Sequence, residues 1–196
     1  MTAKGKSFQT IGEVSVNYIN YLEEPISTKS IMTGFDSIAN GLQLGSLTIL
    51  AARPSMGKTT LALNMAVNIA IKQNIPLAYF SLEMDSKECV QSIFSSLNEI
   101  DKHTLRTLQS SSEELQLINN SALEISNSPL FFSSSCLMSL QDVCGSIEQM
   151  TKDVGLKVVI IDYLQLLYTT SKSDDYSERM LEITHTLRLL AVKLDI

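Results

Sequence analysis

The stretch AARPSMGKTT, residues 51–60, decides how this sequence is interpreted. It ends like the phosphate-binding pattern G-x-x-x-x-G-K-[ST], but Ala52 stands where the first glycine should be. Alanine serves as well as glycine at that position if its backbone φ is negative. The stretch is therefore either a phosphate-binding loop with one unusual residue or a chance Gly-Lys-Thr.

The segments on either side are those that a phosphate-binding loop requires. Residues 47–52, LTILAA, are predicted to form a buried strand, and Lys58–Ile71 are predicted to form a helix rich in Ala and Leu. In such a strand–loop–helix unit, backbone N–H groups at the start of the helix point at the phosphates of a nucleotide. These flanking elements favour a nucleotide site over a chance match.

Each residue type in the loop has an expected role. Gly57 allows the backbone to approach the phosphates, and Lys58 supplies a positive charge for the β- and γ-phosphates during binding and catalysis. Thr59 supplies a hydroxyl ligand for Mg²⁺. For Met56, local packing is an alternative to ligand contact. The residues predicted to bind the nucleotide are Ser55, Met56, Gly57, Lys58, Thr59 and Thr60.

The rest of the chain alternates between strand and helix signals. Further strands are predicted at residues 77–81, 130–133 and 157–162, and further helices at residues 86–97, 112–125, 139–152 and 176–194. This alternation is typical of an α/β fold in which helices connect the strands of a parallel sheet.

Two carboxylates are candidates for the chemistry that a phosphate loop alone cannot perform. Asp162 ends the apolar run VVIID, and Glu83 follows the strand at residues 77–81, so both fall at the carboxyl edge of the predicted sheet, where ligands bind. We predict that Asp162 organises Mg²⁺ and that Glu83 activates the attacking water. The alternative for Glu83 is a solvated cap of the next helix, a role that Asp85 or Ser86 fills better.

Composition limits the classes of function. The 196 residues are 44% hydrophobic and 18% charged, as in globular domains. A net charge of −6 argues against nucleic-acid binding by overall charge, so such binding would need a local patch or another subunit. The three cysteines and two histidines lack metal-ligand spacing, which argues against zinc and for reduced thiols in the cytoplasm. Since no apolar run is long enough for a bilayer, no membrane association is expected.

The N-terminal region is predicted to be a separate element. Apolar residues recur at helical spacing over residues 11–22, and the polar stretch PISTKSIMTG, residues 25–34, reads as a linker. The helix packs either on its own domain or on a neighbouring subunit, and the pattern does not separate these alternatives. We divide the chain into a linker with an amphipathic helix, residues 1–30, and a partial ATPase domain, residues 31–196.

Four strings together resemble a known family. They are TGFDSIANGL, LTILAARPSMGKTT, AYFSLEM and VVIIDYLQLL, in this order. In order and spacing they resemble the C-terminal motor domain of the bacterial replicative DNA helicases of the DnaB type, in superfamily 4 with a RecA-like fold. RPSMGKT, SLEM and DYLQL separate this family from recombinases and AAA+ proteins. The resemblance covers about residues 8–196.

The resemblance implies an ATP-dependent motor. In this family six subunits form a ring around single-stranded DNA, ATP is hydrolysed between subunits, and other replication proteins are possible partners. It implies phosphate and Mg²⁺ binding by Lys58 and Thr59, a catalytic base at Glu83 and a Mg²⁺ ligand at Asp162. It also favours contact between helix 11–22 and the next subunit. Alanine at the position of Ala52 is frequent in the family.

The sequence departs from the family at both ends. No primase-interacting domain precedes residue 8. Beyond Ile196 the family has a strand with a γ-phosphate-sensing glutamine, DNA-binding loops and an arginine finger, and none has a counterpart here. That strand would lie between residues 47–52 and 157–162, so two sheet edges would be left unpaired. We therefore expect the isolated chain to be poorly stable or to aggregate unless another polypeptide supplies the strand.

Three hypotheses of function follow. The chain is part of a helicase motor that binds and hydrolyses ATP with Mg²⁺ to move on single-stranded DNA and unwind duplex. Alternatively, it is a non-catalytic ATP-binding fragment that associates with full-length rings through helix 11–22. A third possibility, another RecA-like ATPase such as a recombination protein, is disfavoured by RPSMGKT and DYLQL.

Overall fold

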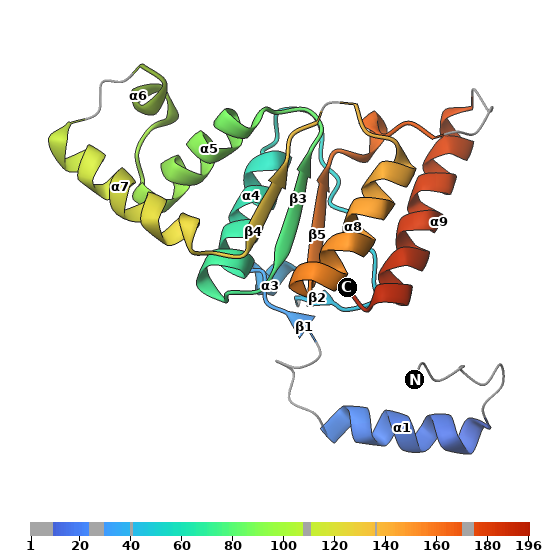
Figure 1. The fold of residues 1–196 in the computed structure, drawn as a ribbon. Coiled ribbons are helices and arrows are strands. Elements are labelled where there is room, and N and C mark those ends of the chain that lie inside the picture. Colours follow the sequence, from blue (N-terminus) through green and yellow to red (C-terminus); the bar gives the residue numbers. More distant parts are fainter. Residues whose placement is uncertain (1–9, 24–29, 40, 108–110, 136, 170–174) are drawn as a thin grey trace.

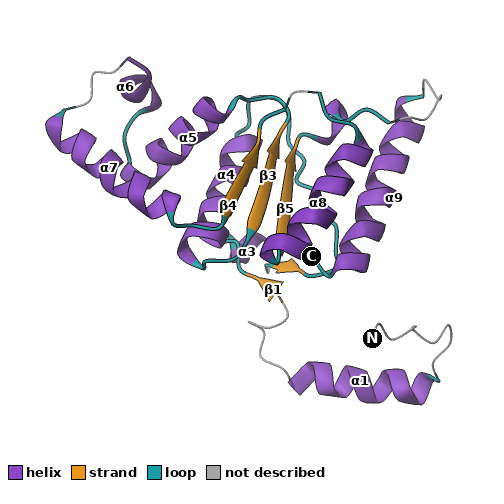
Figure 2. Cartoon of the chain, viewed as in Figure 1, coloured by secondary structure: helices purple, strands orange, loops and turns teal. Residues whose placement is uncertain are grey.

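The central element is a parallel sheet. The computed structural model describes residues 10–23, 30–39, 41–107, 111–135, 137–169 and 175–196. Within these residues, strands β3 (Leu77–Ser81), β4 (Leu130–Ser133) and β5 (Val158–Asp162) pair in the order β4-β3-β5 (Figures 1 and 2). Both pairings are parallel, which confirms the predicted α/β fold and the strands predicted at these positions.

Helices flank the sheet on both faces, while α1 and α6 lie away from it in Figure 1. Their bounds are Ile11–Glu23 (α1), Lys58–Ala66 (α4) continued by the π-helical η1 (Val67–Lys72), Ser86–Asn98 (α5), Lys102–Thr107 (α6), Ser112–Ser126 (α7), Leu140–Val154 (α8) and Tyr176–Leu194 (α9). Helix α4 lies behind the sheet in Figure 1 and α8 lies in front, with α9 beside it. Except for α6, the sequence predicts each of these helices to within a few residues. No helix in the described part of the chain is long and apolar enough to cross a membrane.

Strand β3 is buried on both faces, which explains its unbroken apolar sequence. Leu77 and Tyr79 join a core cluster with residues of α4 and η1. Ala78 and Phe80 point to the opposite face and join a second cluster with residues of α8 and α9. All of β3 is buried, so a shift of its register by one residue would exchange side chains of different size between the two clusters.

Residues 47–52 do not form the predicted strand. No strand pairing among the described residues includes them, and Ile49 and Leu50 are 62% and 41% exposed. Two residues before this segment, the Gly45 N–H donates a hydrogen bond to the Ile196 carbonyl at 2.9 Å. A strand needs a hydrogen-bonded neighbour, and within the described ranges β5 pairs only with β3. The apolar pattern indicates a tendency to pair, but no described segment beside it completes the ladder.

Several short elements are not predicted by the sequence. Strands β1 (Ser30–Ile31) and β2 (Leu42–Gln43) pair in antiparallel fashion, and α3 (Asp36–Ala39) and the 3-10 helix η2 (Leu164–Leu166) are also present. The predicted linker is therefore wrong at residues 30–31, where buried Ile31 packs against the α4 core cluster. Residues 25–29 of that linker lie outside the described residues. The two-residue strands and the helices of three or four residues, which span about one turn, are too short to show a periodicity.

A tight turn before α3 attaches the N-terminal part of the domain to η1. The Asp36 carboxylate accepts hydrogen bonds from the backbone N–H of Thr33 at 2.7 Å and of Gly34 at 3.3 Å. These hydrogen bonds lower the pKa of Asp36, the one from the Thr33 N–H most strongly. The Asn68 amide donates to the Thr33 carbonyl at 3.0 Å. Gly34 has a φ of +82°, and a Cβ there would lie 2.1 Å from Asn68 Nδ2.

We expect Gly34→Ala to destabilise the domain. The positive φ is strained for alanine, and the added methyl would displace the Asn68 amide from the Thr33 carbonyl. The expected loss is about 2 kcal/mol in the free energy of unfolding, measured by urea denaturation. Gly155→Ala is the matched control, because Gly155 also has a positive φ but no described atom would lie within 4 Å of its Cβ. Equal losses in both variants would show that backbone strain alone acts at Gly34.

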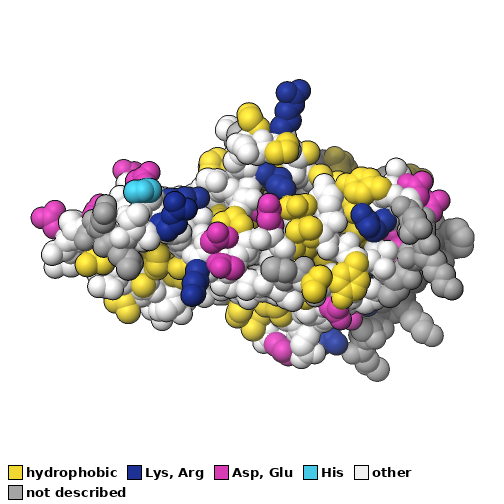
Figure 3. Space-filling model, turned by 90° about the horizontal axis from the view of Figure 1, so that it is seen from above, with side chains coloured by type: hydrophobic (Ala, Val, Ile, Leu, Met, Phe, Trp, Pro, Cys, Tyr) yellow, Lys and Arg dark blue, Asp and Glu magenta, His cyan; other side chains and the backbone are white. Residues whose placement is uncertain are grey.

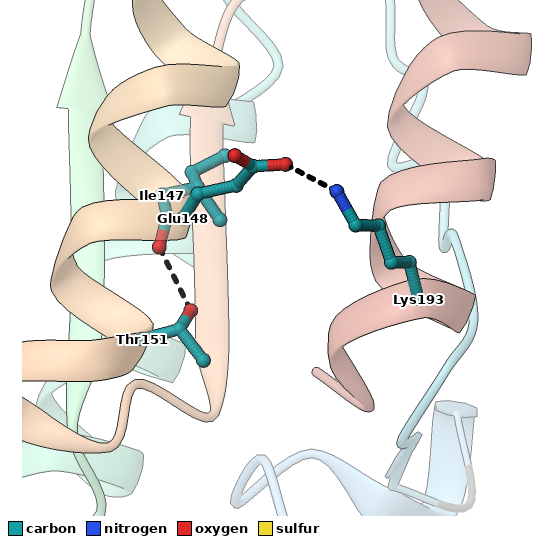
Figure 4. Close-up of polar contacts among 4 residues, drawn as sticks. All are labelled: Ile147, Glu148, Thr151 and Lys193. Carbon is teal, nitrogen blue, oxygen red and sulfur yellow. Dashed lines mark hydrogen bonds and ion pairs between the residues drawn. The ribbon is translucent and has the colours of Figure 1, made fainter. Parts of the chain in front are cut away.

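Helices α8 and α9 are joined by an ion pair on the surface. Lys193 Nζ lies 2.7 Å from Glu148 Oε1, and Figure 4 shows the two side chains reaching across from α8 and α9. One turn along α8, the Thr151 hydroxyl donates to the Ile147 carbonyl at 2.8 Å. The hydrogen bond from Lys193 and its positive charge lower the pKa of Glu148.

The Lys193→Met variant tests this pair through pH. Because the pKa of Glu148 is lower in the folded chain, the pair stabilises the fold above the unfolded-state pKa of Glu148. This contribution is lost as the pH falls through the folded-state pKa. In Lys193→Met the pKa of Glu148, followed by NMR titration, should rise toward its ordinary value. Lys87→Met, on α5, should leave it unchanged. A Glu148 pKa that is the same with and without Lys193 would contradict the contact.

Candidate nucleotide-binding site

The loop before α4 leaves backbone donors available at the start of the helix. Gly57, just before the helix, has a φ of +82°, and no described side chain caps the helix N-terminus. Ser55 also has a positive φ, of 62°, so the loop turns sharply immediately before Lys58. Uncapped N–H groups and the positive end of the helix dipole favour an anion at this point. Met56 is 73% exposed and extends from the loop into solvent.

Lys58 and Asp162 form an ion pair at the end of β5. Lys58 Nζ lies 3.3 Å from Asp162 Oδ1, and the two side chains are 28% and 8% exposed. The Lys58 ammonium also lies over the Tyr163 ring, 4.4 Å from its centre. The structure thus brings together the predicted phosphate-binding lysine and the predicted Mg²⁺-binding carboxylate, which are distant in sequence.

Tyr79 holds the other oxygen of the same carboxylate. Its hydroxyl donates to Asp162 Oδ2 at 3.1 Å from a fully buried position in β3. Burial, and then the negative charge of Asp162, raise the pKa of Tyr79 far above its ordinary value, so the phenol remains a donor. Sequence reasoning missed Tyr79. The available signal was a polar ring in the middle of the otherwise apolar part of the predicted strand LAYFS.

Glu83 lies at the same edge of the sheet and is free of the capping role. Ser81 is the register partner of Asp162, and the Leu82 N–H donates to the Asp162 carbonyl at 2.9 Å, so Glu83 follows directly. The Glu83 side chain is exposed. Asp85 caps α5 by accepting from the Glu88 N–H at 2.8 Å. The alternative role of Glu83 as a helix cap is therefore filled by Asp85.

The two threonines occupy different surroundings. Thr59 is half-buried in the first turn of α4, next to Lys58. Thr60 is exposed and faces α5, where it lines a small hollow with residues such as Ser92 and Ser96. Thr59 is therefore better placed than Thr60 to reach a ligand at the loop.

The residues present fit a magnesium–nucleotide complex. Mg²⁺ prefers oxygen ligands and is usually bound by one or two carboxylates together with substrate phosphates. Asp162 and the Thr59 hydroxyl are the protein oxygens suited to it here. Among the described residues there is no group of three or more His, Cys, Asp or Glu side chains that could hold a metal ion.

The carboxyl edge of the sheet is mixed in charge. Figure 3 views the molecule from this side and shows basic, acidic and hydrophobic side chains interspersed over the visible face. The described residues on this face form no broad basic area, in keeping with the net charge of −6. The local positive features at this edge are Lys58 and the start of α4, which would favour an anion there.

Comparison with known proteins decides the family. The model of the DnaB-like helicase C terminal domain matches residues 27–196. The chain belongs to this family. It is 34% identical to the replicative DNA helicase DnaB of Leifsonia xyli subsp. xyli over 173 residues, which are 87% of this chain and 38% of that protein. It is 30% identical to the replicative DNA helicase DnaC of Bacillus subtilis over 198 residues, 97% of this chain and 44% of that protein.

Solved structures confirm the RecA-like fold. One solved structure that matches is of a DnaB-like replicative helicase and its interactions with primase. The TM-score is 0.84 and the sequence identity is 25%, and the match covers 100% of this chain and 48% of that one. A second solved structure, of an isolated ATPase domain, matches with a TM-score of 0.83 and 26% identity over 97% of this chain and 69% of that one. This family member spans less than half of the two curated relatives named above.

We expect Lys58→Met to destabilise this family member even without ligand. The substitution leaves the buried Asp162 carboxylate with Tyr79 as its remaining close partner among the described side chains. The expected loss is about 1–3 kcal/mol in the free energy of unfolding by urea denaturation. Adding Asp162→Asn removes the negative charge and should recover part of the loss, while Lys72→Met, on η1, should have little effect. Equal stability of Lys58→Met and the unsubstituted chain would contradict the ion pair.

Proposed function

We propose that the loop at residues 53–60 binds ATP with Mg²⁺. The observation that carries the proposal is the meeting of an uncapped helix start, Lys58 and the buried Asp162 carboxylate at one sheet edge. Lys58 would exchange its contact with Asp162 for the β- and γ-phosphates, while backbone N–H groups of residues 57–60 would surround the phosphates. Thr59 and Asp162 would then face the metal. When bound, the metal would neutralise part of the negative charge of the phosphates.

Hydrolysis is assigned to Glu83 within the same proposal. The exposed carboxylate follows β3, two residues beyond the register partner of Asp162. From there it would accept the proton of a water that attacks the γ-phosphate in line. The hydrogen bond that caps α5 comes from Asp85, which leaves the Glu83 carboxylate available for this role.

At the level of the whole protein, we propose an ATP-dependent DNA helicase motor. The family membership supports translocation along single-stranded DNA and assembly into a hexameric ring, with other replication proteins as possible partners. We propose the division into a linker, residues 1–30, and an ATPase domain, residues 31–196, with the exception of Ser30, which pairs with Gln43 and belongs with the domain. The described side chains of α1 are exposed, including Ile11, Tyr18 and Ile19, which supports its contact with a neighbouring subunit.

One alternative is supported by a separate observation. Within the described residues, segment 47–52 is unpaired and β5 has a free edge, so the sheet is open beside the loop. A chain in this state could bind ATP and associate with full-length rings through α1 without hydrolysing ATP. DNA-stimulated hydrolysis by the purified chain would favour the motor, and ATP binding with no hydrolysis would favour the alternative.

The test of the ATP site is calorimetric titration of the 196-residue chain with ATP in the presence of Mg²⁺. We expect Lys58→Ala to raise the dissociation constant at least about tenfold, through loss of one charged phosphate contact. Glu83→Gln should bind ATP as tightly as the unsubstituted chain but lose hydrolysis. Lys72→Ala and Glu88→Gln are the matched controls. No detectable ATP binding by the unsubstituted chain would overturn the proposal.

A further inference from the structure

We propose that Tyr79 is the positioning residue for the metal-binding carboxylate of Asp162. The proposal rests on the Mg²⁺–ATP site proposed above and adds to it the residue that orients the Asp162 carboxylate. The carboxylate has two oxygens, and the structure gives each a different partner. Oδ1 faces Lys58 at 3.3 Å, and Oδ2 accepts from the Tyr79 hydroxyl at 3.1 Å.

The two partners differ in how firmly they are held. The Lys58 side chain is 28% exposed and ends a flexible chain of methylenes, so it is free to turn toward an incoming phosphate. Tyr79 is fully buried, and its ring stacks on Phe132 with centroids 5.0 Å apart. It also packs in the cluster that includes Ala66 and Val67. Its hydroxyl therefore has little freedom to leave Asp162.

Nucleotide binding would separate the roles of the two partners. When Lys58 turns to the phosphates, Asp162 Oδ1 loses its partner and becomes available to the metal or to a water of its shell. Oδ2 remains bonded to Tyr79 from the interior side, which fixes the carboxylate plane and directs Oδ1 outward. Without the phenol, the carboxylate could rotate about its last bond, and a buried oxygen would lose its donor.

The position of Tyr79 in the sheet makes this contact specific. Its register partners are Phe132 on β4 and Ile160 on β5, and Asp162 lies two residues beyond Ile160 on the same face. The Tyr79 ring extends along the strand direction far enough for its hydroxyl to reach the Asp162 carboxylate. A phenylalanine would fill the same space without the hydrogen bond.

The first part of the experiment is the Mg²⁺ dependence of ATP binding by the full 196-residue chain. In Tyr79→Phe, the Mg²⁺ concentration that gives half-maximal ATP binding should rise about tenfold or more, as is typical for loss of a residue that orients a metal ligand. ATP affinity in EDTA, where no metal is bound, should be unchanged. Phe80→Leu is the matched structural control, because Phe80 lies on the opposite face of β3 and its loss keeps both the hydroxyl and the ring packing of Tyr79. It should lower stability and leave the half-maximal Mg²⁺ concentration unchanged.

The second part needs no nucleotide. A double-mutant cycle of Tyr79→Phe and Asp162→Asn, followed by urea unfolding, should show coupling of about fivefold or more in the unfolding equilibrium constant. Additive effects, or an unchanged Mg²⁺ requirement in Tyr79→Phe with ATP binding intact, would overturn the positioning role and leave the ATP site standing. Absence of ATP binding by the unsubstituted chain would overturn the ATP site, and the positioning role with it.

Discussion

The parallel pairing of β3 with β5 is the constraint on which the site depends. Because Ser81 lies opposite Asp162, the two strands end at the same level, and the residues that follow them share one edge. Burial of β3 on both faces holds this register, since a shift by one residue would exchange its two core clusters. Glu83, Asp162 and the start of α4 are brought to one place by packing that is itself apolar.

The buried carboxylate at that edge connects core packing to chemistry. Asp162 is 6% exposed, and a buried charge is costly unless it is paired. Asp162 has two partners: Lys58 from the loop pairs with one carboxylate oxygen, and Tyr79 from the core donates a hydrogen bond to the other. In the proposed site a metal ion would take the place of the partly exposed Lys58, whereas Tyr79 is fixed by its surroundings. The site therefore combines one movable partner with one rigid partner around the same group.

Much of the fold follows from periodicity, and the failures have physical causes. β3, β4, β5 and the longer helices are long enough to show apolar runs or helical spacing, and the sequence predicts them at nearly their observed bounds. Residues 47–52 carry the same apolar signal and do not pair with any described strand, because a strand is defined by its neighbour as much as by its own residues. The short β1 and β2 depend on each other and on burial of Ile31, which no local pattern shows.

The sequence by itself determined the family and which residues are candidates for the phosphate loop and its two carboxylates. These candidates are recognised by residue types at fixed spacing along the chain. Examples are the Gly-Lys-Thr of residues 57–59 and the apolar run that ends at Asp162. The tertiary structure alone decided that Lys58 pairs with Asp162, that Asp85 rather than Glu83 caps α5, and that Tyr79 reaches the same carboxylate. Residues 79 and 162 meet because parallel strands from distant parts of the chain lie side by side. That proximity results from strand pairing in the sheet, and the residue spacing within either strand does not predict it.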